Sequence, residues 1–224
     1  MTIRALIFDF DGLILETEGP SYQSWEAVYR SFGISLPFST WSTIIGTTQG
    51  PFNPMQELQK RVKGEVDWEA LEARRMASEQ ALNEAQPILP GVEEYLQDAR
   101  RMGLKTGLAS SSSRNWVMGH LTRLRLDSFF DCIRASDDVQ FVKPHPELYL
   151  SVLEGLNVTP QEAIALEDSP NGIQSAKQAG IYCVAVPNPL TKRLQLSQAD
   201  MVLDSLAEMP LSQLLKKVNT SQVH

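Results

Sequence analysis

The first strongly patterned segment of the chain is a nearly continuous apolar run over residues 3–10. An apolar run without an alternating polar face is typical of a strand that is buried on both sides within a parallel sheet. Asp9 and Asp11 close this segment, and Gly12 follows them directly. Because open parallel sheets bind ligands at the carboxyl ends of their strands, the segment predicts a central strand that brings two carboxylates to a ligand site.

The next part of the chain, residues 19–85, shows no strand pattern, and its apolar positions follow the period of a helix. Tyr22, Trp25 and Val28 are spaced in this way, and we interpret such side chains as the core of a small helical unit. We expect this unit to be a cap domain of residues 16–87 that stands over the carboxyl edge of the sheet.

Beyond residues 87–91, strand and helix patterns alternate. The predicted strands cover residues 104–109, 130–135, 163–166 and 181–186, and the predicted helices cover residues 92–102, 114–124, 146–156 and 171–179. With the first strand, this alternation predicts a five-stranded parallel sheet with helices on both faces, because right-handed crossovers place the helices outside the strands. The predicted fold class is therefore α/β, with a Rossmann-like core of residues 1–15 and 88–224 and an inserted helical cap.

Composition narrows the class of partner. The chain has 224 residues, 42% of them hydrophobic, which is enough for a sizeable core, and a net charge of −7. This charge argues against general binding to nucleic acid or to anionic membranes, and it favours a small molecule as the partner. The sequence has neither a leader pattern nor a membrane-spanning apolar run, so a cytoplasmic location is expected. The amino-acid sequence does not define an oligomeric state. Cys132 and Cys183 lack metal-like spacing and are expected to be reduced core residues.

A run of four serines follows the second predicted strand. Ser110 lies nearest the strand end, where a hydroxyl and free backbone amides near a helix start suit a phosphate oxygen. We also predict that the neighbouring Ser111 contacts the substrate. Ser112 or Ser113 more simply caps the helix that follows, because an N-cap side chain satisfies free backbone donors.

Two later strand ends also carry charged side chains. Lys143, between an apolar pair and a proline, is interpreted as a positioned cation that holds an anion or balances carboxylates. Glu167 and Asp168 follow the fourth predicted strand. Asp168 alone would be an ordinary helix cap, but with Asp9 and Asp11 it supplies the oxygen ligands that a six-coordinate magnesium ion needs.

These residue types point to phosphoryl transfer, which depends mainly on positioning and on neutralising the charge of the substrate. A carboxylate that attacks phosphorus forms an aspartyl-phosphate, while a neighbouring acid protonates the leaving oxygen and later activates water. Asp9 fits the first role and Asp11 fits the second.

Four segments together resemble the ordered motifs of the haloacid dehalogenase superfamily, in its phosphatase branch with a helical cap after the first strand. They are Asp9-Phe10-Asp11-Gly12, Ser110, Lys143-Pro144 and Glu167-Asp168-Ser169. The amino-acid sequence around the last three segments is similar to that of the beta-phosphoglucomutase-like subgroup.

The resemblance implies a role for each matching position. Asp9 would be the nucleophile and Asp11 the general acid and base, while Ser110 and Lys143 would grip the transferring phosphoryl group. Magnesium would be held by Asp9, the backbone carbonyl of Asp11 and Asp168, with Glu167 contributing directly or through water.

Three alternatives to a phosphatase are ranked lower. Dehalogenases of the superfamily usually lack the second acid, so Asp11 disfavours that chemistry. Sugar mutases of the subgroup carry an arginine in the cap where this chain has Gln49, and a histidine where it has Ser21. Gln49 cannot supply the charged fork of a guanidinium group. A non-catalytic module that binds a phosphorylated ligand would be expected to have lost some of these motif residues.

The cap loop is expected to set substrate preference, with Gly46, Thr47 and Gln49 as candidate substrate contacts. Arg74 and Arg75 are expected at the surface of the cap, with the alternative that one of them reaches a phosphate from the cap. The predicted substrate is a small phosphomonoester, and the sequence leaves sugar phosphates, nucleotides and phosphoglycolate open.

Overall fold

The apolar run at the start of the chain forms strand β1 (Ala5–Phe8), which lies near the centre of a six-stranded sheet. The computed structural model describes residues 2–47 and 50–221, and in it the strand order is β3-β2-β1-β4-β5-β6, with every pair parallel. The other strands are β2 (Lys105–Ala109), β3 (Cys132–Arg134), β4 (Ala163–Glu167), β5 (Tyr182–Ala185) and β6 (Met201–Val202). All four side chains of β1 are buried, as expected for a strand covered on both faces.

The five predicted strands are all present, and β6 is an addition. This strand has only two residues, and the Val202 side chain is 55% exposed, so it lacks the buried apolar pattern that identifies the others.

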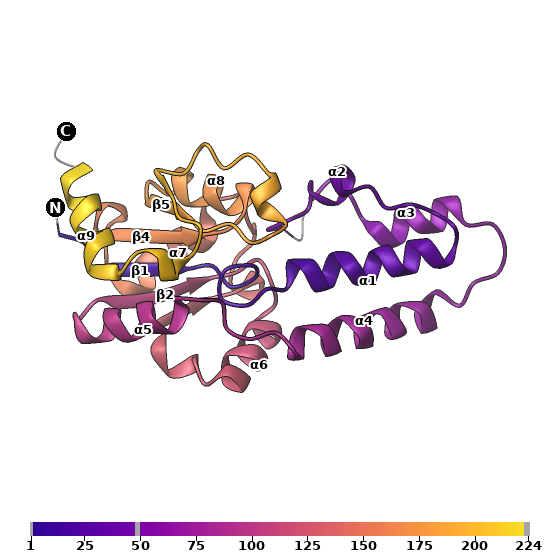
Figure 1. Cartoon of the computed structure of the whole chain (residues 1–224), viewed down its shortest axis with the longest axis horizontal. Helices are drawn as coiled ribbons and strands as arrows, with labels where there is room; N and C mark the ends of the chain where they lie inside the picture. Colours follow the sequence, from indigo (N-terminus) through magenta and orange to yellow (C-terminus); the bar gives the residue numbers. More distant parts are fainter. Residues whose placement is uncertain (1, 48–49, 222–224) are drawn as a thin grey trace.

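Helices cover both faces of the sheet (Figure 1), as predicted. One face packs against α5 (Val92–Arg101), α6 (Arg114–Leu124) and α9 (Leu211–Ser221). The other packs against α7 (Glu147–Leu156) and α8 (Pro170–Gln178). Cys132 and Cys183 are buried free thiols within this second layer, in agreement with their predicted state.

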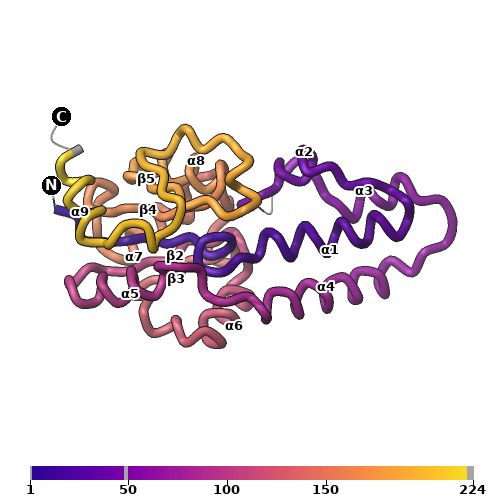
Figure 2. Tube along the Cα trace, viewed as in Figure 1, coloured from indigo at the N-terminus to yellow at the C-terminus, as the bar shows by residue number. Residues whose placement is uncertain are grey.

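The helical region after β1 stands to one side of the sheet, and we refer to its four helices as the cap (Figures 1 and 2). They are α1 (Glu18–Ser31), α2 (Phe38–Trp41), α3 (Pro54–Arg61) and α4 (Trp68–Glu84). The cap has a hydrophobic core of its own, which includes Trp25, Tyr29 and Leu58. Figure 2 shows the chain entering the cap just before α1 and returning to the sheet after α4. The inserted position of the cap confirms the predicted fold class, while its limits at residues 16–87 stay a prediction.

Within residues 2–47 and 50–221, no helix combines the length and the apolarity that crossing a bilayer requires.

Candidate active site

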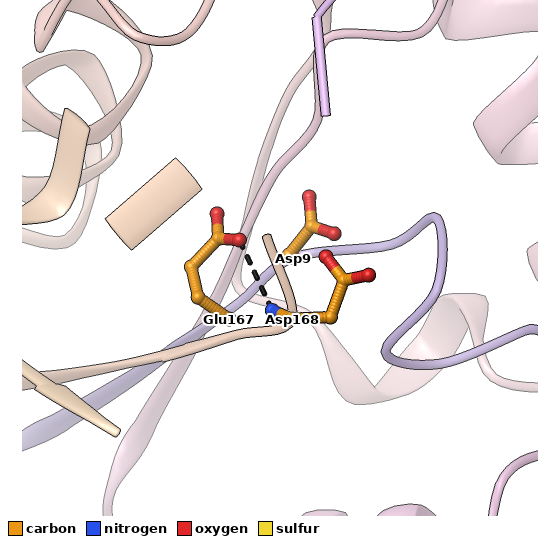
Figure 3. A group of neighbouring side chains, drawn as sticks. All are labelled: Asp9, Glu167 and Asp168. Carbon is orange, nitrogen blue, oxygen red and sulfur yellow. Dashed lines mark hydrogen bonds between the residues drawn. The ribbon is translucent and has the colours of Figure 1, made fainter. Parts of the chain in front are cut away.

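Three acidic side chains meet at the carboxyl edge of the sheet (Figure 3). Asp9 comes directly after β1, and Glu167 and Asp168 come from the end of β4. Since β1 and β4 are paired neighbours, these residues emerge side by side. One ligand oxygen from each lies within 4.8 Å of the other two, and all three residues are buried.

Lys143 supplies a positive charge to this acidic cluster. Its Nζ lies 2.5 Å from Asp9 Oδ1 and 2.6 Å from Glu167 Oε1, and its side chain is only 1% exposed. Glu167 Oε1 also accepts a hydrogen bond of 2.7 Å from the Tyr149 hydroxyl. Burial by itself lowers the pKa of Lys143, but the carboxylates of Asp9 and Glu167 more than offset this effect, so its pKa lies above its usual value. Lys143 is thus a fixed ammonium group, as the sequence predicted.

One ammonium group does not balance three carboxyl groups. Burial raises the pKa of Asp9 to about 8; Lys143 opposes this increase, and the charges of Glu167 and Asp11 add to it. Burial also raises the pKa of Asp168 well above its usual value, and Asp9 and Glu167 reinforce the effect. The excess of negative charge is what a bound divalent cation would relieve.

Asp168 has an oxygen available for such a cation. Its Oδ2 accepts a 2.8 Å hydrogen bond from the Asn188 side-chain amide, whereas its buried Oδ1 accepts no hydrogen bond from any described residue. A buried carboxylate oxygen without a donor, beside two further carboxylates, fits a hard cation such as magnesium. Gly12 allows this close approach: it has a φ of +85°, and a Cβ there would lie 2.2 Å from Asp168 Oδ2.

The Asp11 side chain is held by four donors. Its Oδ1 accepts hydrogen bonds from Thr17 Oγ1 at 2.8 Å and Trp116 Nε1 at 2.9 Å. Its Oδ2 accepts from Ser112 Oγ at 2.6 Å and Ser110 Oγ at 3.3 Å. Asp11 therefore connects two parts of the chain: the segment that leads into the cap, through Thr17, and the start of α6, through Ser112 and Trp116.

The serines of this run have different hydrogen-bond partners. Ser113 is the N-cap of α6 and accepts a hydrogen bond from the Trp116 backbone amide, as predicted for one of the pair. Ser112 does not share this role; its hydroxyl donates to Asp11 instead. Ser110 is fully buried and accepts a 3.0 Å hydrogen bond from the Ser112 amide. The expectation that Ser112 or Ser113 caps the helix is confirmed for Ser113, because α6 begins at Arg114.

Ser111 and Gly46, two of the predicted substrate contacts, meet across the boundary between core and cap. The Ser111 hydroxyl donates to the Gly46 carbonyl at 3.3 Å, and the Gly46 amide donates to Glu18 Oε1 at 3.4 Å. Burial raises the pKa of Glu18 to about 8, and the charge of Asp11 adds to this increase. Thr47 follows Gly46 in the same loop, whereas Gln49 lies outside the described residues.

A cavity of about 790 Å³ lies between the cap and the core. Asp9, Asp11 and Ser111 line it from the core, and Gly46 and Thr47 line it from the cap. The structure thus brings Asp9, Asp11 and two of the predicted cap contacts to one cavity, which suits a small ligand.

The sheet, its acidic carboxyl edge and the inserted cap define a hydrolase class, and comparison with known proteins agrees. The chain belongs to the haloacid dehalogenase-like hydrolase family, whose model matches residues 6–186. Within that family it is a phosphatase of the beta-phosphoglucomutase-like subgroup, as the resemblance of its motifs indicated.

Individual relatives cover nearly the whole chain. The Bacillus subtilis (strain 168) protein YhcW, whose name proposes a phosphatase, is 44% identical over 218 residues, covering 97% of this chain and 99% of that protein. Hexitol phosphatase B of Escherichia coli (strain K12) is 31% identical over 218 residues, covering 95% and 97%. The crystal structure of beta-phosphoglucomutase from Clostridium difficile is similar with a TM-score of 0.76 at 28% identity, and the match covers 100% of both chains.

Proposed function

We propose that the chain is a magnesium-dependent phosphatase that hydrolyses a small phosphomonoester, such as a sugar phosphate, through an aspartyl-phosphate on Asp9. The observation that carries this proposal is the position of Asp9: it lines the cavity, while Lys143 binds one of its oxygens. A fixed carboxylate at the wall of a ligand cavity is suited to attack an electrophile. The names of two relatives, a hexitol phosphatase and a beta-phosphoglucomutase, support a phosphorylated sugar or polyol as the substrate.

The proposed reaction has two steps, formation of the aspartyl-phosphate and its hydrolysis. In the first, a carboxylate oxygen of Asp9 bonds to phosphorus as the bond from phosphorus to the leaving oxygen breaks, and Asp11 gives that oxygen its proton. In the second, water attacks phosphorus, Asp11 accepts a proton from the water, and the bond to Asp9 breaks. Since Thr17 holds Asp11 and directly precedes α1, the orientation of Asp11 is connected to the position of the cap.

The remaining predicted residues have supporting roles in this proposal. Asp9, the backbone carbonyl of Asp11 and Asp168 would hold magnesium, with Glu167 acting through water because Lys143 and Tyr149 already occupy one of its oxygens. The bound ion supplies charge neutralisation at the phosphoryl oxygens.

Lys143 and Ser110 would grip the phosphoryl group. Gly46, Thr47, Gln49 and Ser111 would contact the rest of the substrate, and residues 16–87 would form the cap domain. The cytoplasmic location remains a prediction.

Removal of the metal should stop the reaction. We expect phosphate release from glucitol 6-phosphate to fall by at least about 1000-fold when EDTA is added, because the lost charge neutralisation amounts to several kcal/mol. Magnesium added in excess of the chelator should restore the rate. Release that continues undiminished in EDTA would contradict the metal dependence.

The same assay separates the phosphatase from a mutase, which the similarity to beta-phosphoglucomutase keeps as the second candidate. Beta-glucose 1-phosphate and its bisphosphate activator are supplied with magnesium, and both free phosphate and glucose 6-phosphate are measured. We expect free phosphate without isomerisation. Isomerisation without net phosphate release would favour the mutase.

A further inference from the structure

The charged side chains on the cavity wall limit what can occupy the space beside the reacting phosphate. Apart from Asp9 and Asp11, the charged residues that line the cavity in the described part of the chain are Glu18, Arg75, Glu79, Glu84 and Arg123. Acidic groups are therefore in excess, and the charge available to a second anion depends on the surroundings of the two arginines.

Arg75 is already paired within the cap. Contrary to the expectation of a surface position, its side chain is only 9% exposed. Its guanidinium forms ion pairs with Glu72 at 2.8 Å and with Glu79, donates to Ser24 Oγ at 3.1 Å, and lies over the Trp25 ring. Two carboxylates thus more than balance this cation, and it presents no net positive charge to the cavity.

Arg123 is likewise engaged, at the end of α4. Its guanidinium donates to the backbone carbonyls of Glu84 at 3.2 Å and Asn83 at 3.4 Å, and it contacts His120 Nδ1 at 3.3 Å. The last carbonyls of a helix carry a partial negative charge, which this guanidinium neutralises. Arg123 therefore stabilises the return from the cap to the core.

Uncharged groups make up much of the remaining wall. Trp25, Trp41 and Met76 present apolar surface, and Ser21 and Gln80 present short polar groups. Aromatic faces beside hydroxyl and amide groups suit the C–H and O–H groups of a sugar or polyol.

We propose that this cavity selects phosphomonoesters whose remainder is hydroxylated and uncharged, and that it rejects substrates with a second anionic group, whether carboxylate or phosphate. This inference rests on the proposed function and names its substrate class. Glu79 lines the cavity that a second anion would enter, while Arg75 is shared by two carboxylates and Arg123 donates to backbone carbonyls. Because Glu72 and Glu79 share one guanidinium, this part of the wall carries net negative charge, which disfavours an anionic ligand.

Two esters that differ only at the far end test the proposal. Glucitol 6-phosphate ends in a CH₂OH group where 6-phosphogluconate has a carboxylate. We expect kcat/KM to be at least about 20-fold lower for 6-phosphogluconate, with a similar order for glycerol 3-phosphate and 3-phosphoglycerate. Equal values within each pair would overturn the proposal.

Binding measurements keep this inference separate from the proposed activity. Calorimetry with magnesium-loaded Asp9→Asn protein measures affinity for both six-carbon esters without turnover. Tighter binding of glucitol 6-phosphate supports the charge selection even if the native chain hydrolyses neither ester, an outcome that would refute only the phosphatase. Equal affinities contradict the charge selection whatever the activity.

Variants of α4 should shift the preference. Glu79→Gln removes one partner of Arg75, so kcat/KM for 6-phosphogluconate should rise at least about fivefold relative to glucitol 6-phosphate. Gln80→Lys adds a cation at an exposed wall residue without disturbing the buried pair, and should act in the same direction. Glu57→Gln is the matched control, because Glu57 pairs with Lys60 and Arg61 on α3 and does not line the cavity. A folded Glu79→Gln or Gln80→Lys protein with the native ratio would contradict the proposal.

Discussion

Asp9→Asn should abolish phosphate release, lowering kcat by at least about 10,000-fold, as expected for loss of a catalytic nucleophile. Asparagine has nearly the shape of aspartate, and its carbonyl oxygen can still accept the hydrogen bond from Lys143. The protein should therefore fold normally while its side chain at position 9 is unable to attack phosphorus. The measurement is steady-state phosphate release from glucitol 6-phosphate at saturating magnesium.

A matched change elsewhere controls for the loss of one acidic group. Asp127 is exposed and lies between α6 and β3, and it does not line the cavity. Asp127→Asn should leave kcat unchanged. An Asp9→Asn protein that keeps more than about a hundredth of the native kcat would exclude Asp9 as the nucleophile.

Lys143→Met should destabilise the fold by about 3–5 kcal/mol near neutral pH, because it leaves buried carboxylates without their cation. Methionine retains the length and apolar character of the lysine stem, so the change in the free energy of unfolding reports the loss of the positive charge. Asp9 and Glu167 both lie within hydrogen-bond distance of Lys143 Nζ, and both are buried. Urea unfolding in EDTA, followed by circular dichroism, measures the difference in the free energy of unfolding.

The pH dependence of this loss has a definite sign. The pKa of Asp9 in the folded protein is raised from 3.8 to about 8, so ionising this group weakens the fold as pH rises through that window. Lys143 opposes the increase, and its removal should raise the pKa of Asp9 further. The native and variant proteins should therefore differ more at pH 9 than at pH 6, because above about pH 8 the native Asp9 ionises beside Lys143 while Asp9 of the variant stays protonated. A loss that is independent of pH would mean that Lys143 acts only by packing.

Residues that follow β1 and β4 could be predicted because their positions depend on local pattern and simple topology. An apolar run defines each strand, and parallel neighbours end at the same edge, so Asp9, Glu167 and Asp168 converge without knowledge of side-chain packing.

Contacts set by long-range packing could not be predicted in the same way. The indole of Trp116 reaches Asp11 only because α6 packs beside the entry to the cap, and Asn188 reaches Asp168 from the segment beyond β5. The sequence predicts a surface position for Arg75 because charged side chains usually lie at the surface. Its pairing with Glu72 and Glu79 at helical spacing is visible in the sequence, but its burial depends on how α1 and α4 pack.

The central claim is that Asp9 carries the phosphoryl group between substrate and water. A single-turnover reaction with magnesium is stopped with borohydride, which reduces an acyl phosphate to an alcohol, and the peptides are mapped by mass spectrometry. The account predicts homoserine at position 9, formed only when substrate is present. Phosphate release with aspartate intact at position 9, and with the reduced residue at another position, would contradict it.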